Sequence, residues 1–207
     1  MSSEVCEIET LNGPEWLADR YPWRQNRTVV NGRRMAYLDE GPRDGRPVLL
    51  LHGNPNWSYL YRYFVPALVR GGYRAIAPDW IGAGNSDKPR IDSGYSLAHH
   101  VADLVALIDR LDLHDFVIVG HDWGGAVAWM AALTRPDRVD RLVIVNAPHP
   151  YLFQRALFDD PEQRAASQYI TRFRDTRLDQ GLVGAGLERF FGSTFVHHVT
   201  QAIAGED

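Results

Sequence analysis

Four short apolar runs constrain the fold of this sequence more than any other feature. Hydrophobic residues follow one another in these runs, without the alternation that marks a strand with one face in water. The runs cover residues 47–51, 73–77, 116–119 and 141–145. Such runs are typical of strands that are covered on both faces, so they predict neighbouring strands of a parallel sheet.

Helical patterns separate these runs. Residues 59–70 precede Gly71-Gly72, a signal for the end of a helix. Ser96 is placed to cap a helix whose apolar positions recur at spacings of three and four over residues 97–111. A third helix is predicted over residues 124–133. This alternation of strands and helices predicts an α/β fold, with a mostly parallel sheet and flanking helices.

Two further segments flank the α/β pattern. Asn31-Gly32 lies between the apolar and alternating stretches 27–30 and 33–39, which predicts a β-hairpin because both central residues of its turn must accept a positive φ. After residue 150 no good strand follows, and the pattern predicts helices over residues 161–174, 178–191 and 195–204. We therefore divide the chain into a core, residues 1–150, and an incomplete helical cap region, residues 151–207, with the final strands of the fold absent.

Composition excludes several classes of function. The net charge of the 207 residues is −4, so no basic field would attract nucleic acid or an anionic membrane. The single cysteine, Cys6, excludes an internal disulfide. The start of the chain lacks the layout of a secretory signal, and no apolar run approaches the roughly 20 residues that cross a bilayer. The histidines are scattered without ligand spacing. We expect a cytoplasmic protein with no cofactor and no metal.

The most informative motif is Gly120-His121-Asp122-Trp123-Gly124. It follows an apolar run and precedes a helix, the context of a tight strand-to-helix turn that exposes its central side chain. The usual central residue is serine, but here it is Asp122. A carboxylate needs no base to be activated, and it can attack saturated carbon to form an ester with the enzyme. At a helix N-terminus such a carboxylate is expected to stay ionised. The alternative interpretation is an ordinary aspartate that caps the helix.

A second motif, His52-Gly53-Asn54-Pro55, directly follows the run at 47–51. A loop in this place supplies one main-chain N–H of an oxyanion hole, and the residue after the nucleophile supplies the other. We assign these donors to Asn54 and Trp123. The side-chain amide of Asn54 and the indole of Trp123 could also donate hydrogen bonds to a leaving halide. The alternative interpretation is a simple turn at the end of a strand.

Together these motifs resemble the α/β-hydrolase superfamily, in the branch shared by epoxide hydrolases and haloalkane dehalogenases. The resemblance runs from about Gly32 to Phe153 and more loosely beyond. The residues that carry it are His52 to Arg62, Ala77-Pro78-Asp79, Gly82, Gly84, Ser86 to Pro89, Gly120 to Gly125 and Asn146 to Pro150. The resemblance implies hydrolysis, through an ester on Asp122, of a small apolar electrophile with water as the second substrate.

Within this branch the sequence resembles both families. Asn54 and the stretch from Trp57 to Arg62 resemble haloalkane dehalogenases. The stretches Asn146 to Pro150 and Gln168 to Phe173 resemble epoxide hydrolases. By that resemblance Tyr169 would donate its phenolic proton to the epoxide oxygen during attack; the alternative is a tyrosine that packs on the core. We favour an epoxide hydrolase, with a haloalkane dehalogenase as the alternative.

The resemblance also implies an acid and a histidine base on loops after later strands, and we find no candidate for either. His197-His198 and His99-His100 lie in helical stretches, and His121 adjoins the nucleophile, so we expect packing or surface roles for them. Turnover is therefore expected to be poor, and a non-catalytic binding protein or inactive fragment remains an alternative. A carboxylesterase would need serine at position 122. A sheet without its last strands would expose an apolar edge, so self-association is expected.

Overall fold

The computed structural model describes residues 9–11, 15–90 and 92–173 of the chain. It divides into two compact units, Met1–Pro150 and Tyr151–Asp207. The interpretation of residues 1–150 as a core and of residues 151–207 as a cap region stays a prediction. The units are described separately below.

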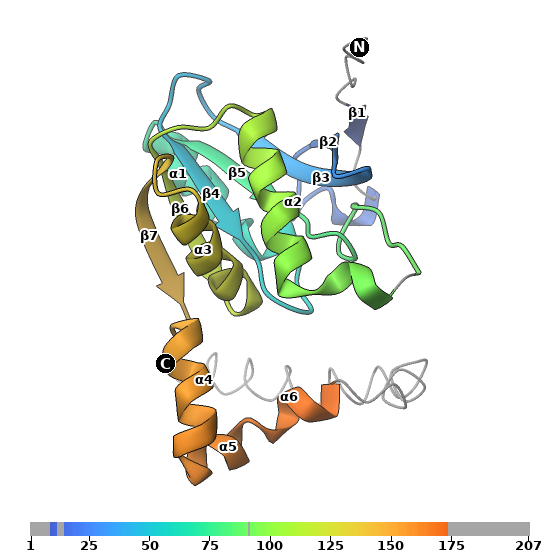
Figure 1. The fold of residues 1–207 in the computed structure, drawn as a ribbon. Coiled ribbons are helices and arrows are strands. Elements are labelled where there is room, and N and C mark those ends of the chain that lie inside the picture. The colour runs from blue at the N-terminus through green and yellow to red at the C-terminus, as the bar shows by residue number, and fades with distance from the viewer. Residues whose placement is uncertain (1–8, 12–14, 91, 174–207) are drawn as a thin grey trace, which may run out of the picture. The chain divides into compact units, whose positions relative to one another are not determined.

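The first unit is built on a seven-stranded sheet in the order β1-β2-β3-β5-β4-β6-β7 (Figure 1). The strands are β1 (Glu9–Leu11), β2 (Gln25–Val30), β3 (Arg33–Glu40), β4 (Pro47–Leu51), β5 (Arg74–Pro78), β6 (Phe116–His121) and β7 (Val139–Val145). The strands from β1 to β3 pair antiparallel, and β3 pairs antiparallel with β5. The pairs β5–β4, β4–β6 and β6–β7 are parallel. The α/β-hydrolase fold is confirmed: the sheet is mixed, and its parallel part runs through β5, β4, β6 and β7.

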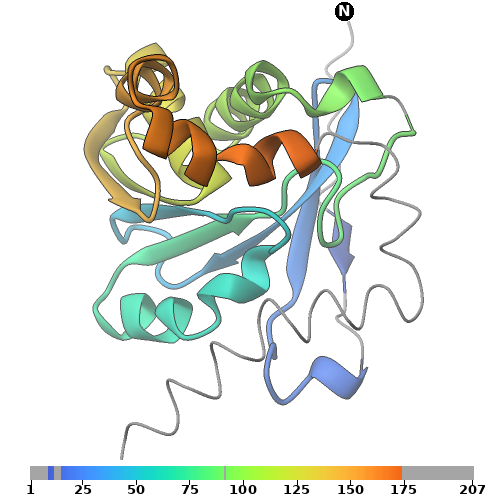
Figure 2. The same ribbon diagram turned by 90° about the horizontal axis from the view of Figure 1, so that it is seen from below.

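Helices cover both faces of this sheet (Figure 2). The helical elements of the unit are η1 (Glu15–Leu17), η2 (Ser58–Tyr61), α1 (Phe64–Arg70), η3 (Asp92–Tyr95), α2 (Leu97–Arg110) and α3 (Trp123–Thr134). Successive strand residues face opposite sides. Leu49 and Leu51 therefore belong to the core beneath α2 and α3, while Val48 and Leu50 belong to the core that includes Val65 of α1.

Two local predictions are confirmed by the backbone. Asn31 and Gly32 have φ values of 47° and 77°, as a two-residue hairpin turn with positive φ requires. Ser96 caps α2, because its Oγ accepts a hydrogen bond from the main-chain N–H of His99 at 3.3 Å. The helix predicted over residues 59–70 is instead two pieces, η2 and α1. Pro66 explains the break, since a proline lacks the N–H of a helix interior and is tolerated only in the first turn.

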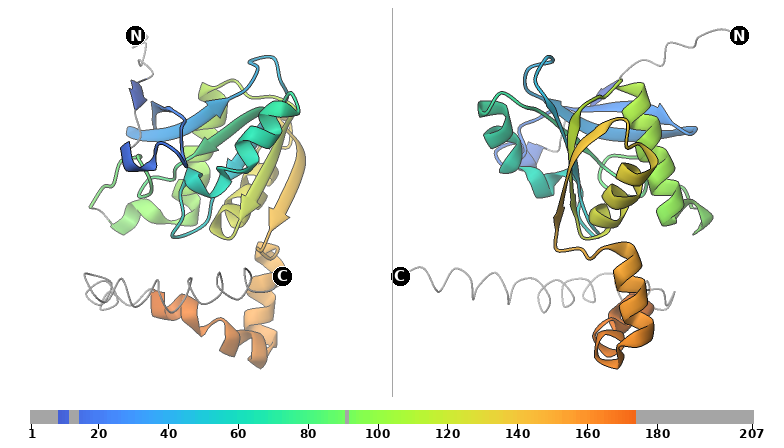
Figure 3. Two further views of the ribbon diagram at one scale, coloured as in Figure 1. Left: turned by 180° about the vertical axis from the view of Figure 1, so that it is seen from behind. Right: turned by 60° about the vertical axis from the view of Figure 1, so that its left-hand side comes forward.

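Strand β7 differs from the prediction that both of its faces are covered. Leu142 and Ile144 pack on the core beneath α2 and α3. Val143 and Val145, on the other face, are 44% and 42% exposed. The reason is the position of β7 at the end of the sheet (Figure 3, right), where no other described element packs on this second face. An apolar run in the sequence thus reports a strand, but not how many of its faces are buried.

The described part of the second unit is helical, as expected. Its helices are α4 (Pro150–Asp159), α5 (Pro161–Ala166) and α6 (Gln168–Phe173). Asp160 caps α5 by accepting hydrogen bonds from the N–H groups of Glu162 and Gln163. The single helix predicted over residues 161–174 is divided at Ser167, and α4 was not predicted. The helices predicted over residues 178–191 and 195–204 lie outside the described residues.

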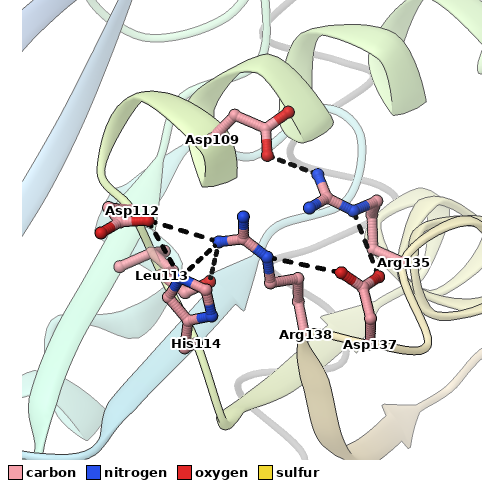
Figure 4. Close-up of polar contacts among 7 residues, drawn as sticks. All are labelled: Asp109, Asp112, Leu113, His114, Arg135, Asp137 and Arg138. Carbon is pink, nitrogen blue, oxygen red and sulfur yellow. Dashed lines mark hydrogen bonds and ion pairs between the residues drawn. The ribbon is translucent and has the colours of Figure 1, made fainter.

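Charged groups tie together the turns that precede β6 and β7 (Figure 4). Arg138 donates to the main-chain oxygen of Leu113 at 3.1 Å and to Nε2 of His114 at 2.8 Å. Arg135 pairs with Asp109 of α2 and with Asp137. These contacts lie at the amino ends of the parallel strands, and the candidate site lies at their carboxyl ends.

Candidate active site

The two motifs singled out in the sequence meet at the carboxyl ends of β4 and β6. Leu51, the last residue of β4, is the register partner of Gly120 in β6. The loop from His52 to Pro55 therefore begins beside the turn that carries Asp122 between β6 and α3. Binding sites in open α/β sheets form at this edge.

Asp122 occupies a backbone conformation that few residues with a side chain adopt. Its φ is 56° and its ψ is −124°. The flanking glycines make this turn feasible. A Cβ on Gly120 would lie 2.4 Å from the main-chain oxygen of Gly124, and a Cβ on Gly124 would lie 2.1 Å from that of Leu51. Glycine is therefore required at both positions, as predicted, because the neighbouring backbone lies too close to leave room for a side chain.

The carboxylate of Asp122 does not cap α3. It makes no side-chain hydrogen bond to the first turn of this helix. Its Oδ1 instead accepts a hydrogen bond from the main-chain N–H of Asn54 at 3.1 Å. The structure thus contradicts the ordinary capping interpretation, and it places one of the two predicted oxyanion-hole donors against the carboxylate.

His52 is a buried residue of this loop, with 1% of its surface exposed. Its Nε2 accepts from the main-chain N–H of Trp80 at 3.1 Å, and its Nδ1 donates to the oxygen of Gly53 at 2.9 Å. Burial lowers the pKa of His52, which keeps the imidazole neutral and consistent with this pattern. With both ring nitrogens occupied, His52 shapes the loop and is not available as a base.

A buried polar network supports the same edge of the sheet, around Asp79 at the end of β5. Its Oδ1 accepts from the N–H of Ser58 at 2.8 Å, and its Oδ2 accepts from Gln25 Nε2 at 2.8 Å and from the N–H of Asn85 at 3.0 Å. The hydroxyl of Tyr21 lies 2.6 Å from Ser58 Oγ, and burial raises the pKa of Tyr21. No role for Asp79 or Trp80 was predicted from the sequence. The only signal was the place of Asp79 within a motif of the resemblance.

The other predicted site residues are Trp123, Asn54 and Tyr169. Trp123 begins α3 directly after Asp122, and its side chain is 48% exposed. Asn54 is exposed and is joined to Pro55 by a cis peptide bond. Tyr169 lies on α6 in the second unit, and its side chain is 55% exposed. Its role as a proton donor stays a prediction.

Within the described ranges, no group of three His, Cys, Asp or Glu side chains is arranged to hold a metal ion. No helix among the described residues has the length and apolar character needed to cross a membrane.

This chain is similar to proteins of a known family. Residues 46–183 match the family described as the alpha/beta hydrolase fold. A haloalkane dehalogenase of Mycolicibacterium paratuberculosis (strain ATCC BAA-968 / K-10) is 49% identical over 113 residues, 55% of this chain and 38% of the relative. One of Psychrobacter cryohalolentis (strain ATCC BAA-1226 / DSM 17306 / VKM B-2378 / K5) is 45% identical over 117 residues, 56% of this chain and 39% of the relative.

A solved structure that is similar to this chain is described as an epoxide hydrolase. It is described as one of the novel epoxide hydrolases of the alpha/beta hydrolases superfamily in metagenomes from hot environments. It is 41% identical, has a TM-score of 0.72, and is matched over 76% of this chain and 53% of its own. The chain thus spans about two-fifths of the curated relatives and about half of this structure. The chain belongs to the alpha/beta hydrolase fold family.

Proposed function

We propose that Asp122 is the nucleophile of a hydrolase that forms an ester with its substrate, and that the favoured substrate is an epoxide. The observation that carries this proposal is the position of the Asp122 carboxylate. It is half-buried at the turn between β6 and α3, at a φ of 56°, and accepts a hydrogen bond from the N–H of Asn54 instead of capping the helix.

Ester formation requires little beyond this arrangement. One carboxylate oxygen attacks a ring carbon of the epoxide, a new C–O bond forms, and the ring C–O bond breaks. The released alkoxide takes a proton, for which Tyr169 is the proposed donor. The N–H of Asn54 stays hydrogen-bonded to the other carboxylate oxygen, which becomes the carbonyl oxygen of the ester. There it would stabilise the oxyanion that forms when water attacks.

Hydrolysis of that ester requires more than these residues. Water must be activated by a base, and His52 is excluded because Trp80 and Gly53 occupy its ring nitrogens. Trp123 N–H is the proposed second donor of the oxyanion hole. The proposal for residues 1–207 is therefore strongest for the first half of the reaction, the formation of the covalent ester.

A haloalkane dehalogenase is the second candidate. The curated relatives with this name are 49% and 45% identical to the chain over 113 and 117 residues. In this alternative the Asp122 carboxylate displaces halide from carbon. The leaving halide would then be held by the side-chain amide of Asn54 and the indole of Trp123.

Intact-protein mass spectrometry separates these candidates. The protein is incubated in parallel with an aryl epoxide and with a primary bromoalkane, and Asp122→Asn serves as the control. Attack on the epoxide adds the whole mass of the reagent, because no group leaves. Attack on the bromoalkane adds the alkyl group alone, because bromide leaves.

We expect a mass addition from the epoxide that is absent in Asp122→Asn. Addition from the bromoalkane alone would support the dehalogenase. Addition from neither reagent to the folded protein would contradict the nucleophile and favour a non-catalytic binding role. In that case reversible ligand binding should survive in Asp122→Asn.

A further inference from the structure

Trp80 holds the loop that carries Asn54 through two hydrogen bonds to one residue. Its indole Nε1–H donates to the main-chain oxygen of His52 at 2.7 Å, and its main-chain N–H donates to His52 Nε2 at 3.1 Å. Both residues are buried, with Trp80 6% and His52 1% exposed. The main chain and the side chain of His52 are therefore held at the same time.

His52 passes this constraint to the next peptide group. Because its Nε2 accepts from Trp80, the proton of the neutral ring is on Nδ1, which donates to the oxygen of Gly53 at 2.9 Å. The main-chain N–H of Asn56 donates to the same oxygen at 3.0 Å. Two donors thus fix the direction of the Gly53 carbonyl.

The Gly53 carbonyl and the Asn54 N–H belong to one peptide group. This group is planar and trans, so its N–H points away from its C=O. Fixing the carbonyl of Gly53 therefore fixes the direction of the N–H that meets Asp122 Oδ1 at 3.1 Å. The peptide also lies directly against the nucleophile, since a Cβ on Gly53 would be 2.4 Å from Cβ of Asp122.

We propose that Trp80 is a positioning residue for Asp122, acting through His52 and the Gly53–Asn54 peptide. In this arrangement the Asn54 N–H stays hydrogen-bonded to Oδ1 of Asp122, and Oδ2 is the oxygen that forms the new bond to carbon. This inference rests on the proposed function, because it concerns the step in which Asp122 forms the ester. Both hydrogen bonds that Trp80 donates go to His52, and neither goes to Asp122.

The test variant is Trp80→Phe. It removes the indole donor and keeps an aromatic ring between His52 and His100, whose ring centroids each lie 5.6 Å from that of Trp80. Loss of one hydrogen bond that positions a reacting group predicts a decrease of about fivefold to tenfold in the rate constant of ester formation at saturating epoxide. The half-saturating epoxide concentration should not change, because Trp80 is buried and both hydrogen bonds that it donates go to His52. Acid-quenched time courses read by intact mass give both quantities.

Trp129→Phe is the matched control. Trp129 is also a tryptophan of the first unit, and its Nε1 has no hydrogen-bond partner in the described part of the chain. This variant keeps the ring and should form the ester at the wild-type rate. A second measurement needs no substrate: amide hydrogen exchange at Asn54 should accelerate severalfold in Trp80→Phe and stay unchanged in Trp129→Phe.

The outcomes distinguish this inference from the proposed function. A slower ester and a faster Asn54 exchange in Trp80→Phe alone would support the positioning role. The positioning role would be overturned if folded Trp80→Phe protein formed the ester and exchanged the Asn54 amide at wild-type rates. It would also be overturned if Trp80→Phe and Trp129→Phe changed these two rates equally. If the wild type forms no ester at all, the proposed function fails, and the exchange of the Asn54 amide still decides whether Trp80 fixes this N–H.

Discussion

The carboxylate of Asp122 receives its hydrogen bond from a loop that follows a different strand. This contact argues against a capping role for Asp122, because a capping carboxylate would turn toward the N–H groups of its own helix. The sequence favoured the nucleophile, because Asp122 lies in a glycine-bounded turn after an apolar run and is accompanied by the His52 to Pro55 motif, but it did not show the direction of the side chain. The choice depends on the side-chain direction, which the positive φ and the neighbouring Gly53 determine together.

A prediction at the residue scale concerns the contribution of the Asp39 carboxylate to stability. Arg74 contacts both of its carboxylate oxygens, at 2.7 and 2.8 Å, and Arg43 pairs with it as well. Burial alone would raise the pKa of Asp39, but its hydrogen bonds and ion pairs with Arg74 and Arg43 outweigh this effect and lower it. We expect Asp39→Asn to lower the free energy of unfolding at pH 7 by about 2–3 kcal/mol, the usual loss for a hydrogen bond to a charged group.

The sign of the pH dependence follows from the lowered pKa. The contribution of Asp39 is present above the ordinary carboxyl pKa of about 4 and is lost as the pH falls through the lower value of the folded state. The difference between wild type and Asp39→Asn should therefore shrink in acid, as measured by urea unfolding between pH 7 and pH 3. Asp44→Asn, at an exposed neighbouring turn, is the control. A pH-independent difference would contradict the assignment.

At the scale of the elements, short-range patterns were predicted and long-range contacts were not. The turn at Asn31-Gly32 and the cap at Ser96 depend on residues within a few positions of each other, so their signals are local. The hydrogen bonds between Trp80 and His52 join residues 28 positions apart. No periodicity reports such a pair, because it exists only after β4 and β5 have paired.

The cap of α2 gives a prediction for an element. Ser96→Ala removes the acceptor for the N–H of His99 and should lower the free energy of unfolding by about 1 kcal/mol. Ser96→Asp keeps an acceptor and adds a negative charge at the N-terminus of the helix, so it should retain stability. Thermal and urea unfolding of the three proteins checks this order. Equal stability of the alanine and aspartate variants would mean that the cap contributes little.

At the scale of the molecule, the sheet ends in a strand with an apolar face. Within the described residues β7 pairs with β6 alone, and Val143 and Val145 are exposed on the side away from α3. The sequence predicted the strand and the order of strands and helices around it. It could not show that one face is open, because burial is set by what packs on the sheet and not by the apolar run itself.

This edge predicts concentration-dependent self-association, since an exposed apolar edge strand can pair with another chain. Val143→Lys should shift the protein toward the monomer in sedimentation velocity measurements. Val29→Lys is the matched control, because Val29 is 42% exposed on β2, a strand with a neighbour on each side. Equal association of both variants would exclude β7 as the interface.

The nucleophilic role of Asp122 is tested most directly by locating the covalent ester. The protein is incubated with the aryl epoxide, digested and sequenced by tandem mass spectrometry across residues 116–134. The account predicts that the whole mass of the epoxide is carried by Asp122. An adduct on a histidine or on any other carboxylate, with Asp122 unmodified, would contradict it.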